Sequence, residues 1–329
     1  MLFSRFIGGR NAQELSKTLL KCKAKNWIPI LDFAKEGSLT KKDVVAYIHG
    51  VKALAGLSPV YALKLSSFAP FKPMNTMDYV ISHLEENGAS HVLLDAERVQ
   101  TSDIENTIFD QLVKSYNKDA PFLYKTYQMY RHDSFANLVA DLGNLPNLGV
   151  KIVRGAYLEQ DKHTGKLYSS YKETHDSYNK ALTFLLSPNH TQAPSYSPSC
   201  THPFRSYQHP YRNLIIATHN LDSISLARKL HAAHPTFHPL QFAQLLGMKD
   251  AMSTDLAKHF NTDTSKDTSK DTSKDTSKDT SKDTSKDTSK DTSKDTYRVY
   301  KYLPYGPTKD MIPYLIRRVY ENMDILKHV

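Results

Sequence analysis

Eight short apolar segments recur along the chain, each with the length and β-rich composition of a buried strand. Helix-like segments separate most of them. The predicted strands are 28–33, 61–67, 91–97, 122–128, 149–157, 214–220, 240–248 and 298–306. The clearest predicted helices are 76–88, 134–144, 174–186, 221–233 and 311–326.

This alternation of strand and helix, repeated eight times, is typical of an α/β fold, the (β/α)8 barrel. A doubly wound sheet of five or six strands is the alternative, but the number of strands favours closure. The helix at 311–326 follows the eighth strand, as a barrel requires. We therefore expect one barrel domain spanning residues 1–329.

Two segments interrupt the alternation. Residues 189–212 are rich in Pro, Ser and His and predict an irregular insertion, whereas residues 263–294 are eight copies of DTSK. Each copy has one negative charge, one positive charge and no apolar residue, so we expect this repeat to be disordered. Both segments lie between a helix and the next strand. In a barrel, such connections lie opposite the catalytic face, so we expect neither insertion to affect the chemistry.

Composition narrows the function only slightly. A net charge of +9 suits an anionic substrate or a negative membrane surface, but the basic residues are scattered, so we expect no nucleic-acid partner. Cys22 and Cys200 are too few for a disulfide framework or a cysteine zinc site. No apolar run approaches the roughly 18 residues that span a bilayer. The basic N-terminus is too short for a full transit peptide.

Polar residues gather where the predicted strands end, and in a barrel these carboxyl ends hold the active site. Polar groups on apolar strands are costly unless they are paired or used. Helix capping explains such residues singly, but it explains the whole set poorly. The set comprises Lys64, Asp95, Glu97, Gln128, residues 151–157, Thr218, His219, Asn220 and Tyr302.

The last predicted helix carries an arginine doublet. Tyr314, Arg317, Arg318 and Glu321 are spaced i, i+3, i+4 and i+7, which places them on one stripe. Two guanidinium groups at a barrel rim form a fork for a carboxylate, and Glu321 can orient Arg317. A solvated ion-pair stripe is the alternative. The residues expected to pack this helix are Met311, Ile312, Leu315, Ile316, Val319 and Met323.

Several motifs, in order, resemble those of the proline dehydrogenase family in its eukaryotic mitochondrial form. The resemblance runs from about residue 6 to residue 322, apart from the two insertions. Each motif alone is weak, and their linked order makes the match specific. The motifs are YALKLSS, LLDAER, TYQMYR, GVKIVRGAYLEQ, ATHN, QLLGM and KYLPYG followed by PYLIRRVYEN.

The resemblance implies a distorted (β/α)8 barrel that binds FAD noncovalently without a Rossmann domain, and GxGxxG is absent here. It implies hydride transfer from L-proline to the flavin, giving Δ1-pyrroline-5-carboxylate in the first step of proline catabolism. Electrons would pass to a membrane quinone. The implied location is the matrix side of the mitochondrial inner membrane, with peripheral membrane association.

The resemblance also assigns roles to individual residues. Asp95 and Lys151 match a polar pair at the reacting centre, where a cation stabilises developing negative charge. Gly155 permits close backbone approach to the cofactor, and His175 or Asp176 is expected near it. The implied substrate-binding residues are Lys64, Tyr302, Tyr314, Arg317, Arg318 and Glu321. The implied cofactor-binding residues are Gln128, Lys151, Val153, Gly155, Ala156, Tyr157, Thr218, His219 and Asn220.

Two other functions stay open: a family member acting on hydroxyproline, and one that has lost catalysis, for which the pure repeat is the motivation. A metal site at His231, His234 and His238 is not expected, because Pro235 breaks the helix before the third histidine. These histidines also precede the seventh strand, at the wrong end of the barrel.

Overall fold

The computed structural model describes residues 3–34, 40–68, 73–97, 99, 102–187, 213–234, 239–258 and 297–321. Its eight parallel strands form a closed barrel in chain order, because β8 pairs with β1 as well as with β7. Closure confirms the predicted (β/α)8 barrel. The strands are β1 (Trp27–Phe33), β2 (Val60–Lys64), β3 (His91–Asp95), β4 (Leu123–Gln128), β5 (Gly149–Val153), β6 (Leu214–Ala217), β7 (Leu240–Leu245) and β8 (Tyr297–Tyr305).

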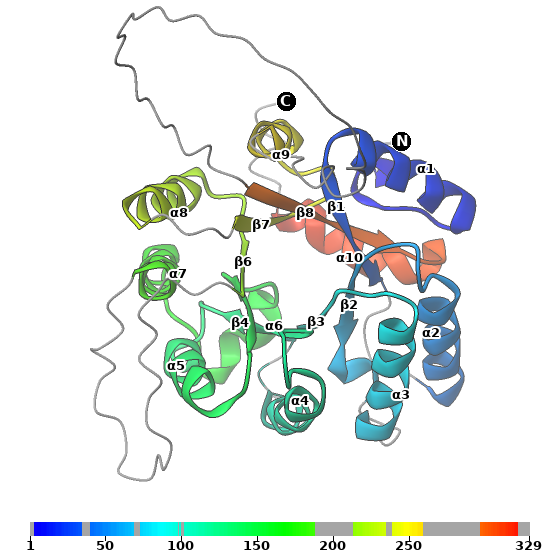
Figure 1. The fold of residues 1–329 in the computed structure, drawn as a ribbon, viewed down its shortest axis with the longest axis horizontal. Coiled ribbons are helices and arrows are strands. Elements are labelled where there is room, and N and C mark those ends of the chain that lie inside the picture. Colours follow the sequence, from blue (N-terminus) through cyan, green and yellow to red (C-terminus); the bar gives the residue numbers. More distant parts are fainter. Residues whose placement is uncertain are drawn as a thin grey trace, which may run out of the picture.

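The helices α1 to α5 and α7 to α9 surround the strands in chain order, as Figure 1 shows. The ends of α5 and α8 agree with the prediction. Helix α7 starts three residues early, because Ser170 and Glu173 form a capping box. The helices are α1 (Ala12–Ala24), α2 (Lys41–Ala53), α3 (Pro73–Glu86), α4 (Ser102–Tyr116), α5 (Ser134–Asn144), α6 (Leu158–Asp161), α7 (Tyr171–Leu186), α8 (Leu221–Ala233), α9 (Asp250–Ala257) and α10 (Thr308–Glu321).

Two hydrophobic cores follow from the alternation of side chains along each strand. One lies between the strands and the surrounding helices. The other fills the barrel, with members such as Ile30, Leu93 and Tyr300. Gly149 belongs to this packing, because a Cβ there would lie 2.4 Å from the Tyr124 ring. Apolar and aromatic side chains therefore fill most of the interior, where Tyr300 also bonds to Gln241. The space that remains lies at the carboxyl ends of the strands, the upper end of the barrel.

Helix α10 packs through a small cluster of its own. Met311, Tyr314 and Leu315 are buried against Ala34, with Phe6 and Ile7 alongside. The expectation that Ile312 and Ile316 also pack is wrong, since they are 48% and 51% exposed. Successive helical residues point about 100° apart, so these two lie beside the buried stripe. The side chains of Val319 and Met323 lie outside the described residues.

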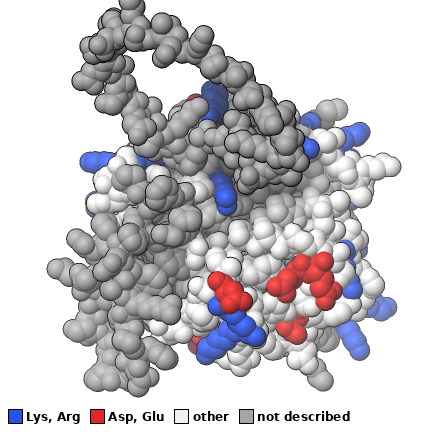
Figure 2. Space-filling view, viewed as in Figure 1, with Lys and Arg blue, Asp and Glu red and all other residues white. Residues whose placement is uncertain are grey.

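The surface in Figure 2 shows Lys and Arg side chains at scattered places, some at the edge and others toward the middle of this face. The acidic side chains form two groups on the lower half. The view thus shows no single charged band on this face.

Across the described ranges, no helix is long and apolar enough to cross a membrane.

Both predicted insertions, 189–212 and 263–294, lie outside the described residues. The first separates α7 from the start of β6, and the second separates α9 from the start of β8. Both insertions therefore precede the amino end of a strand. The predicted disorder of the repeat stays a prediction.

We expect that deleting residues 267–290, six of the eight DTSK copies, leaves the fold intact. Shortening a flexible loop to this extent changes its closure free energy by only about 1 kcal/mol. The unfolding temperature, followed by circular dichroism, should therefore move by no more than about 3 °C. A loss of cooperative unfolding would show that the repeat contributes to the folded core.

Candidate active site

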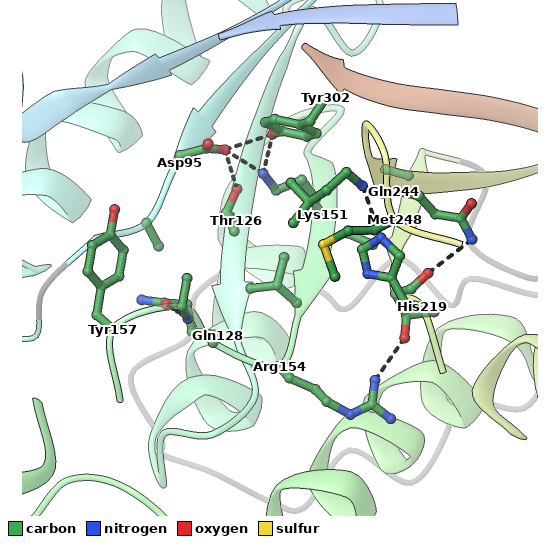
Figure 3. Close-up of a pocket in the computed structure, with 18 of the residues that line it drawn as sticks. Asp95, Thr126, Gln128, Lys151, Arg154, Tyr157, His219, Gln244, Met248 and Tyr302 are labelled. Carbon is green, nitrogen blue, oxygen red and sulfur yellow. Dashed lines mark hydrogen bonds and ion pairs between the residues drawn. The ribbon is translucent and has the colours of Figure 1, made fainter. Parts of the chain in front are cut away.

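A cavity of about 470 Å³ opens at the carboxyl ends of the strands, and every strand contributes to its lining. Figure 3 shows its polar side chains converging from several strands. The predicted site residues that line it are Lys64, Asp95, Gln128, Lys151, Val153, Gly155, Ala156, Tyr157, Thr218, His219, Asn220, Tyr302 and Tyr314. The side chains of Arg317, Arg318 and Glu321 lie outside the described residues, although their backbone belongs to α10.

Asp95, Lys151 and Tyr302 form a hydrogen-bonded cluster inside the mouth of the barrel. The Lys151 ammonium bonds to the Asp95 carboxylate and to the Tyr302 hydroxyl. That hydroxyl also donates to Asp95 Oδ1 over 2.9 Å, and Thr126 Oγ1 donates to the same oxygen over 3.5 Å. These residues come from β3, β5, β8 and β4, so only the closed barrel brings them together.

Tyr302 is 8% exposed within this cluster. Burial raises its pKa well above the usual value, and the nearby Asp95 carboxylate raises it further. Tyr302 therefore keeps its proton and remains a donor to Asp95. The Lys151 ammonium also lies 4.7 Å from the centre of the Tyr302 ring, which adds a cation–π contact.

A second buried ion pair joins Lys64 to Asp32, which lies on the adjacent strand β1. Both residues line the cavity, and both are at most 5% exposed. The sequence analysis missed Asp32, although alternation could have revealed it. In β1, Ile28 and Ile30 belong to the barrel interior, and Asp32 is the next residue on that face. Lys64 thus already has an anionic partner in the cavity.

The loop after β5 is packed tightly against the protein. Gly155 has φ +147°, and a Cβ there would lie 2.5 Å from the ring of Tyr130. The Tyr130 hydroxyl in turn donates to buried Asp161 over 2.9 Å. Gln128 holds the same loop, because its Oε1 accepts from the Ala156 amide over 3.3 Å. Contact with Tyr130 by itself requires glycine at position 155, before any ligand is considered.

Arg154 lines the cavity too; the sequence analysis included it in the block 151–157 but assigned it no role of its own. Its Nη1 donates to Thr218 over 2.9 Å and its Nη2 to Ser223 over 3.0 Å. Nη2 also lies 2.9 Å from His175 Nδ1, whereas Asp176 pairs with Lys172 on the surface. The buried Nε has no hydrogen-bond partner within the described part of the chain. A charged residue directly after a buried strand was the available signal.

The residues after β6 have structural partners of their own. His219 Nε2 accepts from the Leu245 amide over 3.0 Å. Asn220 Oδ1 accepts from the Ser223 amide over 2.9 Å and so caps α8. For Asn220, the capping explanation therefore holds, although this residue also lines the cavity.

Other cavity residues lay outside the prediction. Besides Asp32 and Thr126, they are Ala96, Tyr171, Ala217, Ala243, Gln244, Leu245 and Met248. Glu97 was grouped with the strand-end residues, but its side chain lines a separate cavity of about 40 Å³ beside α4 and α5. Over the described ranges, no group of three or more acidic, His or Cys side chains could hold a metal ion.

Comparison with known proteins identifies the family of this barrel. A family model described as proline dehydrogenase matches residues 15–329. The chain is 29% identical over 265 residues to proline dehydrogenase 1, mitochondrial, of Dictyostelium discoideum, covering 75% of this chain and 37% of that protein. It is also 29% identical over 253 residues to hydroxyproline dehydrogenase of Bos taurus, covering 72% and 43%. The chain thus spans less than half the length of these relatives.

A solved structure shares the fold. Proline utilization A of Bdellovibrio bacteriovorus, inactivated by N-propargylglycine, superposes with a TM-score of 0.71 at 17% sequence identity. The match covers 98% of this chain and 32% of that one. The same protein of Corynebacterium freiburgense gives a TM-score of 0.68, also at 17% identity.

We expect Asp32→Ala to destabilise the protein by about 3–5 kcal/mol, because it leaves the Lys64 ammonium buried without this partner. Lys64→Met should also destabilise it, and the double variant should lose less than the sum. A double-mutant cycle from urea unfolding measures this coupling, about 0.5–3 kcal/mol for neighbours. The exposed Lys172–Asp176 pair is the control and should show little coupling. Additive losses at Asp32 and Lys64 would contradict the pairing.

In Tyr302→Phe, the free energy of unfolding should fall less steeply as the pH rises through the alkaline range. The unfolded tyrosine ionises near pH 10.0, whereas burial raises the folded pKa. The folded state then holds one more proton, so stability is intact below this pH and falls as the pH rises. Removing the hydroxyl should reduce the slope above pH 10 by about 1.4 kcal/mol per pH unit. Urea unfolding between pH 9 and 11 measures the slope, and an unchanged slope would refute the assignment.

Proposed function

The chain belongs to the proline dehydrogenase family, and from this premise we propose that it oxidises L-proline to Δ1-pyrroline-5-carboxylate with FAD as its cofactor. The observation that carries the proposal is the set of buried charges at one end of the barrel. Two lysines and two aspartates converge there on a single cavity. Buried charges are costly, and a structural role alone would be met by apolar residues.

The cavity has groups that fit a flavin dinucleotide. Arg154 lines it with a buried Nε that has no hydrogen-bond partner in the described residues, which suits an anionic ligand. When bound, a flavin would supply a hydride acceptor that later releases its electrons. The residues proposed to hold it are Gln128, Lys151, Arg154, Val153, Gly155, Ala156, Tyr157, Thr218, His219 and Asn220.

Substrate orientation is assigned to α10. Tyr314 lines the cavity, and Arg317 and Arg318 follow it by three and four residues on the same face of the helix. Two guanidinium groups on that face would bind the proline carboxylate in a fixed orientation. Glu321, one turn after Arg317, would orient the first guanidinium. Lys64 would add a third cation, which it shares with Asp32.

The Asp95, Lys151 and Tyr302 cluster is assigned to the reacting centre. Lys151 is held by both partners and cannot turn away without breaking two hydrogen bonds. A cation fixed in advance stabilises negative charge that develops during the reaction. Because the ring carbon beside the amine loses a hydride, the amine must be neutral, and no nucleophilic side chain is required.

The proposed electron acceptor is a quinone in a membrane that the protein contacts peripherally. A net charge of +9 is suited to an anionic membrane surface. The proposed location is the mitochondrion, on the matrix side of the inner membrane, and relatives named as mitochondrial proline dehydrogenase support the organelle. No nucleic-acid partner is proposed.

Hydroxyproline is the second candidate substrate, since hydroxyproline dehydrogenases of Bos taurus and Xenopus laevis are also similar to this chain. Both substrates present the same carboxylate and amine, so the charged residues described above do not distinguish them. The ratio of kcat/KM for L-proline and trans-4-hydroxy-L-proline decides between them, and a ratio below one would replace proline as the substrate.

The proposal predicts that the purified protein binds FAD and that L-proline bleaches the flavin absorbance near about 450 nm under anaerobic conditions. Protein that stays colourless after addition of FAD would favour a family member that has lost catalysis. Bound flavin that proline does not bleach would refute the substrate but leave the cofactor in place.

Replacing Arg317 or Arg318 with Met should raise KM for proline at least about tenfold, the usual effect of losing a charge-assisted hydrogen bond. FAD binding should change little. Lys309→Met is the matched control, because it removes an exposed cation from the first turn of the same helix. Equal KM values for the arginine variants and the control would show that α10 does not bind the carboxylate.

A further inference from the structure

Lys301 is a buried cation outside the cavity. It lies on β8 between Tyr300 and Tyr302, which belong to the barrel interior, so its side chain points outward. The neighbouring outward positions, Val299 and Leu303, are apolar and belong to the outer core. Lys301 is 0% exposed among them. Lysine is almost never fully buried unless it is paired, so its partners indicate its role.

The Lys301 ammonium has three oxygen partners. Its Nζ donates to the Leu245 carbonyl and to the Met248 carbonyl, each over 3.1 Å, and it lies 2.8 Å from Asp250 Oδ1. Lys301 thus makes two hydrogen bonds to backbone carbonyls and one ion pair. The ring of Trp27 lies 5.0 Å away and covers the same group. The three oxygens come from the last residue of β7, the connection after it and the first residue of α9.

The other side of this connection forms part of the cavity wall. The side chains of Leu245 and Met248 line the cavity, and Figure 3 shows Met248 beside His219. The Leu245 amide donates to His219 Nε2 over 3.0 Å. One short segment therefore presents two apolar side chains to the cavity and two carbonyl oxygens to Lys301.

Arg5 binds the backbone of residues 245–248 from another side. Its Nε donates to the Gly247 carbonyl over 2.9 Å. Gly247 has φ +79°, and a Cβ at this position would lie 2.5 Å from the Arg5 carbonyl oxygen. The backbone of residues 245–248 is thus held closely both by β8 and by the N-terminal segment.

We propose that Lys301 is a positioning residue for the cavity: it holds residues 245–248 from outside the barrel and so sets the wall formed by Leu245 and Met248. It touches no ligand itself. The expected effect on ligands rests on the proposed flavin and proline binding, whereas the effect on the backbone does not. Burial lowers the pKa of Lys301, and the Asp250 carboxylate opposes that shift.

A purely structural lysine would affect stability alone, and Lys125 provides that comparison. Lys125 also points outward, from β4, is 9% exposed and pairs with Asp141 over 2.6 Å. Its other contacts in the described part of the chain are with Asp110, Phe109 and Tyr127, and none lies in residues 245–248. Lys125→Met should therefore lower the unfolding temperature without altering that segment.

The test compares Lys301→Met, Lys301→Met with Asp250→Asn, and Arg5→Met with the control Lys125→Met. The double variant also neutralises Asp250, so the two carbonyls are the main groups that lose their donor. Arg5→Met perturbs the segment from its exposed side, where loss of folding is not expected. Hydrogen exchange followed by mass spectrometry reports on the amides of residues 245–248 without any ligand.

We expect amide exchange in residues 245–248 to speed up about tenfold or more in both Lys301 variants, and less in Arg5→Met. In the FAD-loaded enzyme, KM for proline or the Kd of FAD should rise about tenfold, with a smaller change in kcat. Absence of FAD binding by the unchanged protein would refute the proposed function, but the exchange rates would still test whether Lys301 holds residues 245–248. Exchange as slow as in Lys125→Met, in Lys301 variants that fold, would overturn the role proposed for Lys301.

Discussion

The need to pair each buried charge at the upper end of the barrel constrains the rest of the site. Lys64 and Lys151 are each at most 4% exposed, and each has an aspartate partner from another strand. A lysine in such a place without its partner would cost several kcal/mol. Lys64 on β2 reaches Asp32 on the adjacent strand β1, whereas Lys151 on β5 reaches Asp95 on β3, across the strand β4 between them. Both pairs therefore depend on how the strands are arranged around the barrel.

Paired charges also make a rigid site. Side chains that are buried and hydrogen-bonded on both sides lose their freedom during folding, so a ligand does not have to order them again. The lower half of the barrel supports this arrangement, because its apolar residues fill the interior up to the polar level. The packed lower half of the barrel thus stabilises the fold, and the upper end carries the charges in fixed positions.

The loops around the cavity depend on residues that never reach it. Tyr130 packs under Gly155 after β5, and Lys301 binds the carbonyls after β7. In both cases, the backbone of a loop that lines the cavity is held by a side chain that does not line it. A list of cavity residues alone would miss these supports, because Tyr130 follows β4 and Lys301 lies on the outer face of β8.

The sequence by itself determined the eight strands, the closed barrel and most polar positions at the strand ends, because alternation and segment length are local properties. It also gave reason to expect the family, through motifs whose order is visible without a fold. Only the tertiary structure decided that Lys64 pairs with Asp32, that Tyr302 bridges Asp95 and Lys151, and which face of α10 is buried. Those contacts join residues up to 207 positions apart, and their geometry depends on how the strands align when the barrel closes.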